Sequence, residues 1–183
     1  PLHTNMIELP VHSAHTSLSD QLLALGRLAR SEPPAGFLRA AVALIGVHLR
    51  YRGAWWGLCF DRGPDQLPDI VQAEVIGLPE SMTVDWRKVG VDDPFARSAA
   101  LNRGQIQRLV SIRDEFGGAS ALSTLAQQLG IDRGMALCLD ENVSGQIFFV
   151  ALYRTAADPP FANAEATIFL ELVRHIAQLW QFA

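Results

Sequence analysis

The residues best placed to do chemistry lie near the middle of the chain, where Asp93, Pro94 and Phe95 follow Trp86. A carboxylate such as that of Asp93 can accept a hydrogen bond from an amide group of a buried ligand. An aspartate followed by proline is also a typical helix start, with the aspartate as N-cap and the proline at the first helical position. The two roles are compatible, so the pattern predicts a helix from Pro94 onward and makes Asp93 a candidate ligand-binding residue.

Aromatic side chains provide the other candidates for contact with a ligand. Side chains alternate between the two faces of a strand, so Trp55 and Trp56 point to opposite sides, and we assign Trp56 to the inner face. A tryptophan in a pocket wall offers apolar area and one N–H donor, although plain packing in the core is the alternative for each aromatic residue. The predicted ligand-binding residues are Trp56, Phe60, Trp86, Asp93, Phe95 and Phe148.

Catalytic and metal-binding patterns are missing from the sequence. The five histidines show no metal-ligand spacing, and there is no Ser-His-Asp signature, P-loop or glycine-rich dinucleotide loop. Cys59 and Cys138 lie within apolar runs, without the neighbouring His or Lys that activates a thiol. We therefore expect a protein that is not an enzyme, with no catalytic residue, no metal and no cofactor.

Composition indicates a globular domain. The chain has 183 residues, of which 49% are hydrophobic and 19% charged, and this balance excludes intrinsic disorder. No apolar run is long enough to span a membrane. The net charge is −4, and the arginines of the middle segment form no basic helix face, so direct binding of nucleic acid is not favoured. Two unpaired cysteines and the lack of a signal-like opening segment favour a cytoplasmic location.

Hydrophobic periodicity and turn signals predict an α+β fold. Helices are expected at 17–32, 34–50, 95–102, 120–129 and 163–182, and strands at 53–60, 69–78, 135–140 and 146–154. A brief strand is expected within 105–110, and 81–91 is ambiguous. The strands form two hairpins of a central antiparallel sheet with helices on both faces. The terminal helices cover one face and residues 79–133 the other, which provides an internal pocket. Residues 1–15 are expected to be a loose arm, and 16–183 a single domain.

This order of elements resembles GAF and PAS-like sensor domains and, more closely, the N-terminal ligand-sensing domain of LuxR-type bacterial transcription regulators. Asp93-Pro94-Phe95 looks like the Asp-Pro-aliphatic motif of the autoinducer-binding domain. Two further segments are similar to that family. Gly130 to Gly134 connects a predicted helix to a predicted strand, and Pro160-Phe161 precedes a final predicted helix with acidic residues near its start. The resemblance covers about residues 15–182. It implies a GAF-like α-β-α sandwich, a small-molecule ligand and a DNA-binding helix-turn-helix that is absent from this chain.

The last predicted helix is the best candidate for an interface with a partner. Its apolar stripe exceeds what one face of a sheet needs, and a two-fold dimer is the simplest closed arrangement. The predicted dimer-interface residues are Leu172, Ile176, Leu179 and Trp180.

We therefore expect a small-molecule-sensing and dimerising regulatory domain of a LuxR-type regulator, with a quorum-sensing-like role. The ligand is expected to be small and apolar or amphipathic. The protein would form a homodimer, contact DNA only through the missing domain, and make no membrane contact. Two alternatives stay open. One is a ligand-free dimerisation or protein-interaction module whose own side chains fill the pocket. The other is a GAF-type sensor domain of a signalling enzyme.

Overall fold

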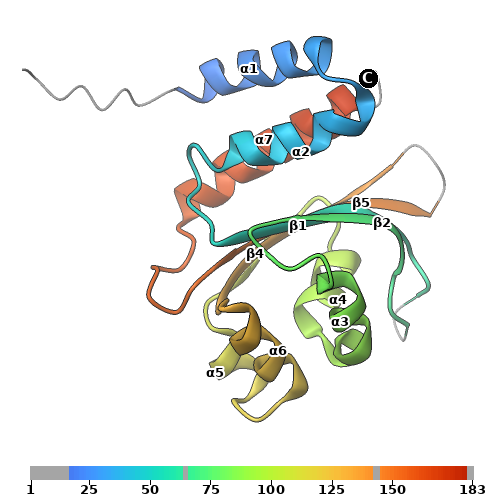
Figure 1. Cartoon of the computed structure of the whole chain (residues 1–183), viewed down its shortest axis with the longest axis vertical. Helices are drawn as coiled ribbons and strands as arrows, with labels where there is room; N and C mark the ends of the chain where they lie inside the picture. Colours follow the sequence, from blue (N-terminus) through green and yellow to red (C-terminus); the bar gives the residue numbers. More distant parts are fainter. Residues whose placement is uncertain (1–16, 64–65, 142–144, 181–183) are drawn as a thin grey trace, which may run out of the picture.

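A five-stranded antiparallel sheet forms the middle layer of the molecule (Figure 1). The computed structural model describes residues 17–63, 66–141 and 145–180. The strands lie in the order β2-β1-β5-β4-β3. Their bounds are β1 Gly53–Phe60, β2 Asp69–Ile76, β3 Gln107–Leu109, β4 Arg133–Asp140 and β5 Gln146–Arg154. The central position of β5 agrees with its sequence, because a strand covered on both faces needs a nearly continuous apolar run.

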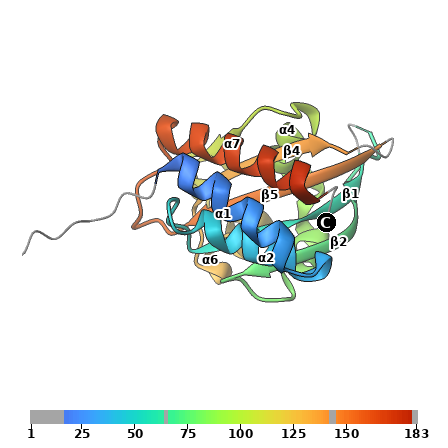
Figure 2. The ribbon, with the colours of Figure 1, turned by 90° about the horizontal axis from the view of Figure 1, so that it is seen from above.

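Three helices from the two ends of the chain cover one face of the sheet (Figures 1 and 2). They are α1 Leu18–Ser31, α2 Pro34–Ile45 and α7 Asn163–Trp180, and each of the three packs against the other two. Their apolar stripes meet even-numbered side chains of β1 and β5 in the larger hydrophobic core, which contains Trp56 and Phe148. The expectation that the terminal helices share one face is confirmed.

Among the described residues, four shorter helices cover the opposite face (Figure 1). They are α3 Met82–Val89, α4 Pro94–Leu101, α5 Ile112–Phe116 and α6 Ala121–Leu129, with the 3₁₀ turn Gly90–Asp92 between α3 and α4. Their apolar residues form a second core with the odd-numbered side chains of β1 and β5. The expected cover of this face by residues 79–133 is confirmed, and so is the α+β class. The helix α5 was not predicted, and the ambiguous segment 81–91 holds α3.

Local capping chemistry explains where several helices begin and end. Ser17 and Asp20 form a capping box at the start of α1, with each side chain accepting from the other residue's backbone N–H. Ser120 caps α6 through the N–H of Ser123. Gly130 ends α6 at a φ of 67°, a left-handed conformation that glycine adopts without steric cost.

Arg154 joins β5 to the start of α7. Only 5% of this residue is exposed, and its guanidinium donates to the carbonyl of Arg50 at 2.7 Å and to Oε1 of Glu165 at 2.5 Å. The central carbon of its guanidinium group, Cζ, lies 4.0 Å from the ring centroid of Phe161, a distance typical of a cation–π contact. Partial burial raises the pKa of Glu165, but the hydrogen bonds from Arg154 and from the N–H of Ala162, with the Arg154 charge, outweigh it and lower the pKa. The ion pair therefore fixes how α7 leaves the sheet.

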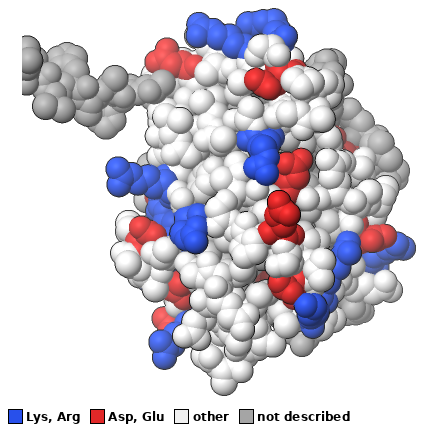
Figure 3. Space-filling model, viewed as in Figure 1, with Lys and Arg blue, Asp and Glu red and all other residues white. Residues whose placement is uncertain are grey.

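The expected arm at residues 1–15 lies outside the described residues. No helix among the described residues is long and apolar enough to cross a bilayer. On the face drawn in Figure 3, Lys and Arg side chains are interspersed with Asp and Glu side chains. That face therefore shows no broad field of a single sign of charge.

Candidate functional site

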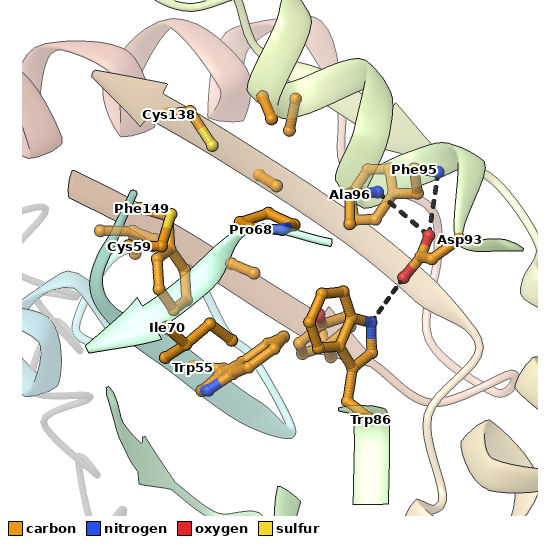
Figure 4. A pocket seen from close by; sticks show the side chains of 16 residues that line it. Trp55, Cys59, Pro68, Ile70, Trp86, Asp93, Phe95, Ala96, Cys138 and Phe149 are labelled. Carbon is orange, nitrogen blue, oxygen red and sulfur yellow. Dashed lines mark hydrogen bonds between the residues drawn. The ribbon is translucent and has the colours of Figure 1, made fainter. Parts of the chain in front are cut away.

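A cavity of about 60 Å³ lies between the sheet and the helices α3 and α4 (Figure 4). Its walls combine two kinds of side chain. Bulky aromatic groups form one part, and small groups from α4 and the sheet form another. The aromatic members are Trp55, Trp86, Phe95, Phe149 and Tyr153; the small ones are Cys59, Ala96, Ala99, Ala100, Ala136, Cys138 and Ala151. Small side chains at buried positions leave space that larger ones would fill, so the composition of the wall itself produces the cavity.

Asp93 is the only charged residue in that wall among the described residues. Its Oδ1 accepts from the backbone N–H groups of Phe95 at 2.9 Å and Ala96 at 3.0 Å, which confirms the predicted N-cap of α4. Its Oδ2 accepts from the indole Nε1 of Trp86 at 2.9 Å, and Figure 4 shows the three contacts converging on one carboxylate. Both oxygens therefore already have a donor from the chain itself.

Trp86 is held in place by close contacts on several sides. Its ring lies 5.3 Å from that of Trp55 in an edge-on arrangement, and Trp55 makes a second edge-on contact with Phe149 at 5.2 Å. A Cβ at Gly90 would lie 2.4 Å from Cε2 of Trp86, so only glycine leaves room for the indole there. The Nε1 of Trp55 donates to Oγ1 of Thr83 at 3.2 Å, which ties α3 to the sheet.

Two smaller cavities share the Trp86–Asp93 pair with the first one. A cavity of about 30 Å³ lies toward the β1–β2 loop, and one of about 40 Å³ lies toward α5 and α6. Trp86 and Asp93 line all three cavities, and Phe95 lines two of them. The hydrogen-bonded pair is therefore part of the partition between separate voids in one apolar layer.

The electrostatics of the site follow from its burial. Burial raises the pKa of Asp93, while the hydrogen bonds from Trp86, Ala96 and Phe95 oppose that rise. Burial, with the nearby Asp93 carboxylate, also raises the pKa of Tyr153, whose hydroxyl therefore stays a hydrogen-bond donor at neutral pH. Burial raises the pKa of Cys59 and of Cys138 to about 12, so both thiols stay protonated. Uncharged wall groups favour a guest that is itself apolar over most of its surface.

Three of the six predicted site residues lie in this wall and three do not. Trp86, Asp93 and Phe95 line the cavity. Trp56 and Phe148 are buried on the other face of the sheet, in the core under α1, α2 and α7, so the expected inner-face position of Trp56 is wrong. Phe60 has the same strand parity as Trp56 and is absent from the cavity wall.

Trp56 lies on the other face for a physical reason. Alternation along β1 fixes which residues share a face, but not which face meets which layer. The residues missed in this way are Trp55, Cys59, Phe149, Ala151 and Tyr153. A usable signal was present, because the odd-numbered positions of β1 include Gly53, Gly57 and Cys59, whereas the even ones carry mainly bulky groups. A face that combines one large aromatic residue with several small ones is the one that leaves space.

The predicted dimer interface divides in a similar way. Leu172 and Ile176 are 1% and 0% exposed and lie in the chain's own core, so the expectation that these two face a partner is wrong. They are buried because the apolar stripe of α7 meets both the sheet and the neighbouring helices. Leu179 and Trp180 are only partly buried at the end of α7. No group of three or more potential metal ligands occurs among the described residues.

Comparison with known proteins identifies the fold. No family model matches the sequence, and no curated protein matches it either. Solved structures of three proteins illustrate the shared architecture. The LuxR-family transcription factor CepR2 from Burkholderia cenocepacia, described as dependent on N-acylhomoserine lactone, has 17% identity and a TM-score of 0.61, with 88% of this chain and 93% of that chain covered.

The second is SdiA, of which one structure is from Escherichia coli and another is in complex with octanoyl-rac-glycerol. The latter has 20% identity and a TM-score of 0.60, with 90% of this chain and 66% of the SdiA chain covered. The third is a GAF domain/HD domain protein from Geobacter sulfurreducens, with 21% identity, a TM-score of 0.55, and 88% and 96% covered. The chain therefore has the fold of the ligand-binding domains of LuxR-family regulators, which is also close to that of GAF domains.

Proposed function

We propose that this chain is the small-molecule-binding regulatory domain of a LuxR-type transcription regulator, acting in the cytoplasm without catalytic activity. The observation that carries the proposal is the apolar cavity between the sheet and the α3–α4 layer, with Asp93 as its one charged group among the described residues. Pockets of this composition, with mostly apolar walls and few polar groups, are typical binding sites for small molecules. The likeness to CepR2 and SdiA supports the same assignment.

The size of the cavity constrains how binding would occur. Sites for drug-sized ligands measure roughly 300–1,000 Å³, whereas this cavity measures about 60 Å³. A ligand with an acyl chain or a fused ring would therefore require the α3–α4 layer to move away from the sheet. Such a ligand would act by binding the expanded arrangement more tightly than the compact one, which is how a ligand shifts a conformational equilibrium.

The proposed ligand is small and apolar or amphipathic. Octanoyl-rac-glycerol in the SdiA complex belongs to that class, with an acyl chain and hydroxyl donors. In this chain the apolar part would contact the aromatic and alanine walls, and a donor would face Asp93. DNA would be contacted only by a helix-turn-helix domain outside this chain, and no membrane contact is part of the proposal.

Homodimerisation is the second half of the proposal. Leu179 and Trp180 are partly buried at the end of α7, and Leu23 on the neighbouring helix α1 is 61% exposed. Exposed apolar groups on adjacent helices are typical of an isologous contact between two copies. Sedimentation equilibrium tests this half. We expect a dimer whose dissociation constant rises when Leu23 is replaced by Glu, whereas a monomer at every concentration would contradict it.

One observation favours a different function. The edge-on contacts of Trp55 with Trp86 and Phe149 fill much of the layer with the chain's own side chains. This packing suits a ligand-free dimerisation or protein-interaction module, which needs a stable layer and no guest. The likeness to the GAF domain/HD domain protein leaves a sensor domain of a signalling enzyme as a further alternative.

Binding of 1-octanoylglycerol, measured by calorimetry and by the shift in melting temperature, separates these functions. We expect saturable binding by the wild type and its loss in Ala151→Leu, because the larger side chain would fill the cavity. Ala119→Leu, at an exposed position, is the matched control and should bind as the wild type does. A wild type that binds neither this probe nor any member of a neutral small-molecule library would favour the interaction module.

A further inference from the structure

Trp86 occupies the one charged acceptor that the cavity offers to a guest among the described residues. Oδ1 of Asp93 is engaged by the two backbone N–H groups of the N-cap, so Oδ2 is the oxygen left for any other donor. That oxygen accepts from the indole Nε1 of Trp86 at 2.9 Å. A carboxylate oxygen can accept two hydrogen bonds, as Oδ1 does here, so Trp86 keeps a ligand from Oδ2 by filling the space beside that oxygen. A ligand that donates to Oδ2 from the cavity therefore competes with the indole for that space.

The indole is also the piece of the wall whose removal changes the space most. Trp86 lines the cavities of about 60, 30 and 40 Å³, so its displacement would join voids that are separate in the compact arrangement. Only 4% of its surface is exposed, and the ring lies directly over Gly90. The chain thus carries a flat aromatic group with one N–H donor in the position where a guest would sit.

We propose that Trp86 is the specificity-determining residue of this site, an internal occupant of the Asp93 acceptor that the ligand must displace. The ligand class follows from what the indole satisfies: an uncharged molecule with an apolar or aromatic body and an N–H or O–H donor for Oδ2 of Asp93. An anion is disfavoured in the cavity of about 60 Å³, because among the described residues no Lys, Arg or His lines it, and Arg97 lines only the adjoining void of about 30 Å³. The proposal rests on the proposed function and adds the residue that selects the ligand.

Replacing Trp86 by Ala and adding free indole tests the occupancy directly. The variant removes the side chain, so indole can enter the same space and donate to Asp93, whereas 1-methylindole has the same shape without the donor. We expect Trp86→Ala to bind indole about tenfold more tightly than the wild type does, and about fivefold more tightly than it binds 1-methylindole. The preference for indole should disappear in the Trp86→Ala, Asp93→Asn double variant. Calorimetry measures each affinity.

A second variant displaces the indole without deleting it. Gly90 has no positive φ, so Ala fits the backbone there, but its Cβ would lie 2.4 Å from Cε2 of Trp86. We expect Gly90→Ala to bind 1-octanoylglycerol at least about threefold more tightly than the wild type does, because the free energy needed to displace the Trp86 ring is smaller in the variant. Val84→Ala is the matched control, since Val84 lies on α3 together with Trp86 and is 55% exposed. Its affinity should equal that of the wild type.

The outcomes separate the two proposals. If Trp86→Ala melts cooperatively but binds indole and 1-methylindole equally, and Gly90→Ala leaves the affinity unchanged, the role of Trp86 is overturned while wild-type binding of 1-octanoylglycerol keeps the proposed function. If the wild type binds no neutral small molecule but Trp86→Ala takes indole with the expected preference, the occupancy of Asp93 by Trp86 is supported and the proposed function is overturned.

Discussion

Asp93 caps α4 through Oδ1 and accepts a hydrogen bond from Trp86 through Oδ2, and substitution can separate these two roles. Asparagine keeps a side-chain oxygen for the N-cap of α4, because Asn caps helices about as well as Asp. Its amide group would then face the indole N–H of Trp86, so two donors would meet where a donor and an acceptor met before. Alanine removes both the N-cap and the acceptor for Trp86. The pair of variants therefore distinguishes the cap from the contact with Trp86.

The magnitudes follow from the contacts. Loss of an N-cap costs about 1 kcal/mol, and a buried donor left without a partner costs about 1–3 kcal/mol. Asp93→Ala should therefore lower the free energy of unfolding by about 2–4 kcal/mol, and Asp93→Asn, which keeps the cap, by about 1–3 kcal/mol. In a chain of this length each kcal/mol lowers the melting temperature by about 2–4 °C. Glu171→Gln, exposed on α7, is the control and should change stability by less than about 0.5 kcal/mol.

Urea denaturation followed by circular dichroism measures these values, and a double-mutant cycle with Trp86→Phe isolates the pair. Phenylalanine removes the donor, so Asp93→Asn should cost about 1 kcal/mol less in that background than in the wild type. Equal costs in both backgrounds, or an Asn variant as unstable as the Ala variant, would refute the division of roles between the two oxygens.

The dependence on pH gives an independent check of the same carboxyl group. Burial raises the pKa of Asp93 in the fold above its ordinary value of 3.8, so the folded state holds the proton more tightly than the unfolded chain does. The stability that Asp93 contributes is therefore complete below pH 3.8 and declines as the pH rises through the folded-state pKa. The stability difference between the wild type and Asp93→Asn should narrow from acid toward neutral pH. A difference that widens over this range would contradict the buried environment.

Further predictions concern the scaffold around the site. Gly57→Ala should destabilise by several kcal/mol, because its Cβ would lie 2.0 Å from a backbone carbonyl oxygen of β2, whereas Gly26→Ala within α1 should stabilise by roughly 0.5–1 kcal/mol in thermal melts. Cys59 and Cys138, with pKa values of about 12, should not react with Ellman's reagent at neutral pH until the protein is unfolded; rapid labelling of the native chain would contradict their burial. The lowered pKa of Glu165 means that its ion pair stabilises the fold above the ordinary pKa of 4.5 and that this stability is lost as the pH falls through the folded-state pKa. In urea denaturation at a series of pH values, the free energy of unfolding of Glu165→Gln should therefore fall less steeply below pH 4.5 than that of the wild type. An equally steep fall in both proteins would exclude this contribution.

Signals confined to a few neighbouring residues predicted the fold well. The strands 53–60 and 146–154 were predicted with the bounds that they have in the structure. The start of α4 at Pro94 was predicted from Asp93-Pro94, because a proline after a capping aspartate leaves little choice to the backbone. The five-residue helix α5 was missed, since one turn and a half carries too little periodicity to stand out.

The candidate site was harder to predict, because it depends on how the two layers are assigned to the two faces. Alternation placed Trp55 and Trp56 on opposite sides correctly, but the choice between the faces depends on contacts between residues distant in sequence. The same limit applies to α7. Its sequence shows that Leu172 and Ile176 lie on an apolar stripe, but only the structure shows that this stripe packs in the chain's own core. The contact between Trp86 and Asp93 was also beyond sequence reasoning, since it joins two helices across the turn Gly90–Asp92.

The most direct test of the central claim uses the four tryptophan indole N–H groups as reporters in the nuclear magnetic resonance spectrum of isotope-labelled protein. Trp55 and Trp86 line the cavity, Trp56 lies in the core on the opposite face, and Trp180 lies at the end of α7. On titration with 1-octanoylglycerol, the signals of Trp55 and Trp86 should shift and saturate together while the other two stay in place. Shifts confined to Trp56 and Trp180, or none up to the solubility limit of the probe, would contradict a small-molecule site in this layer.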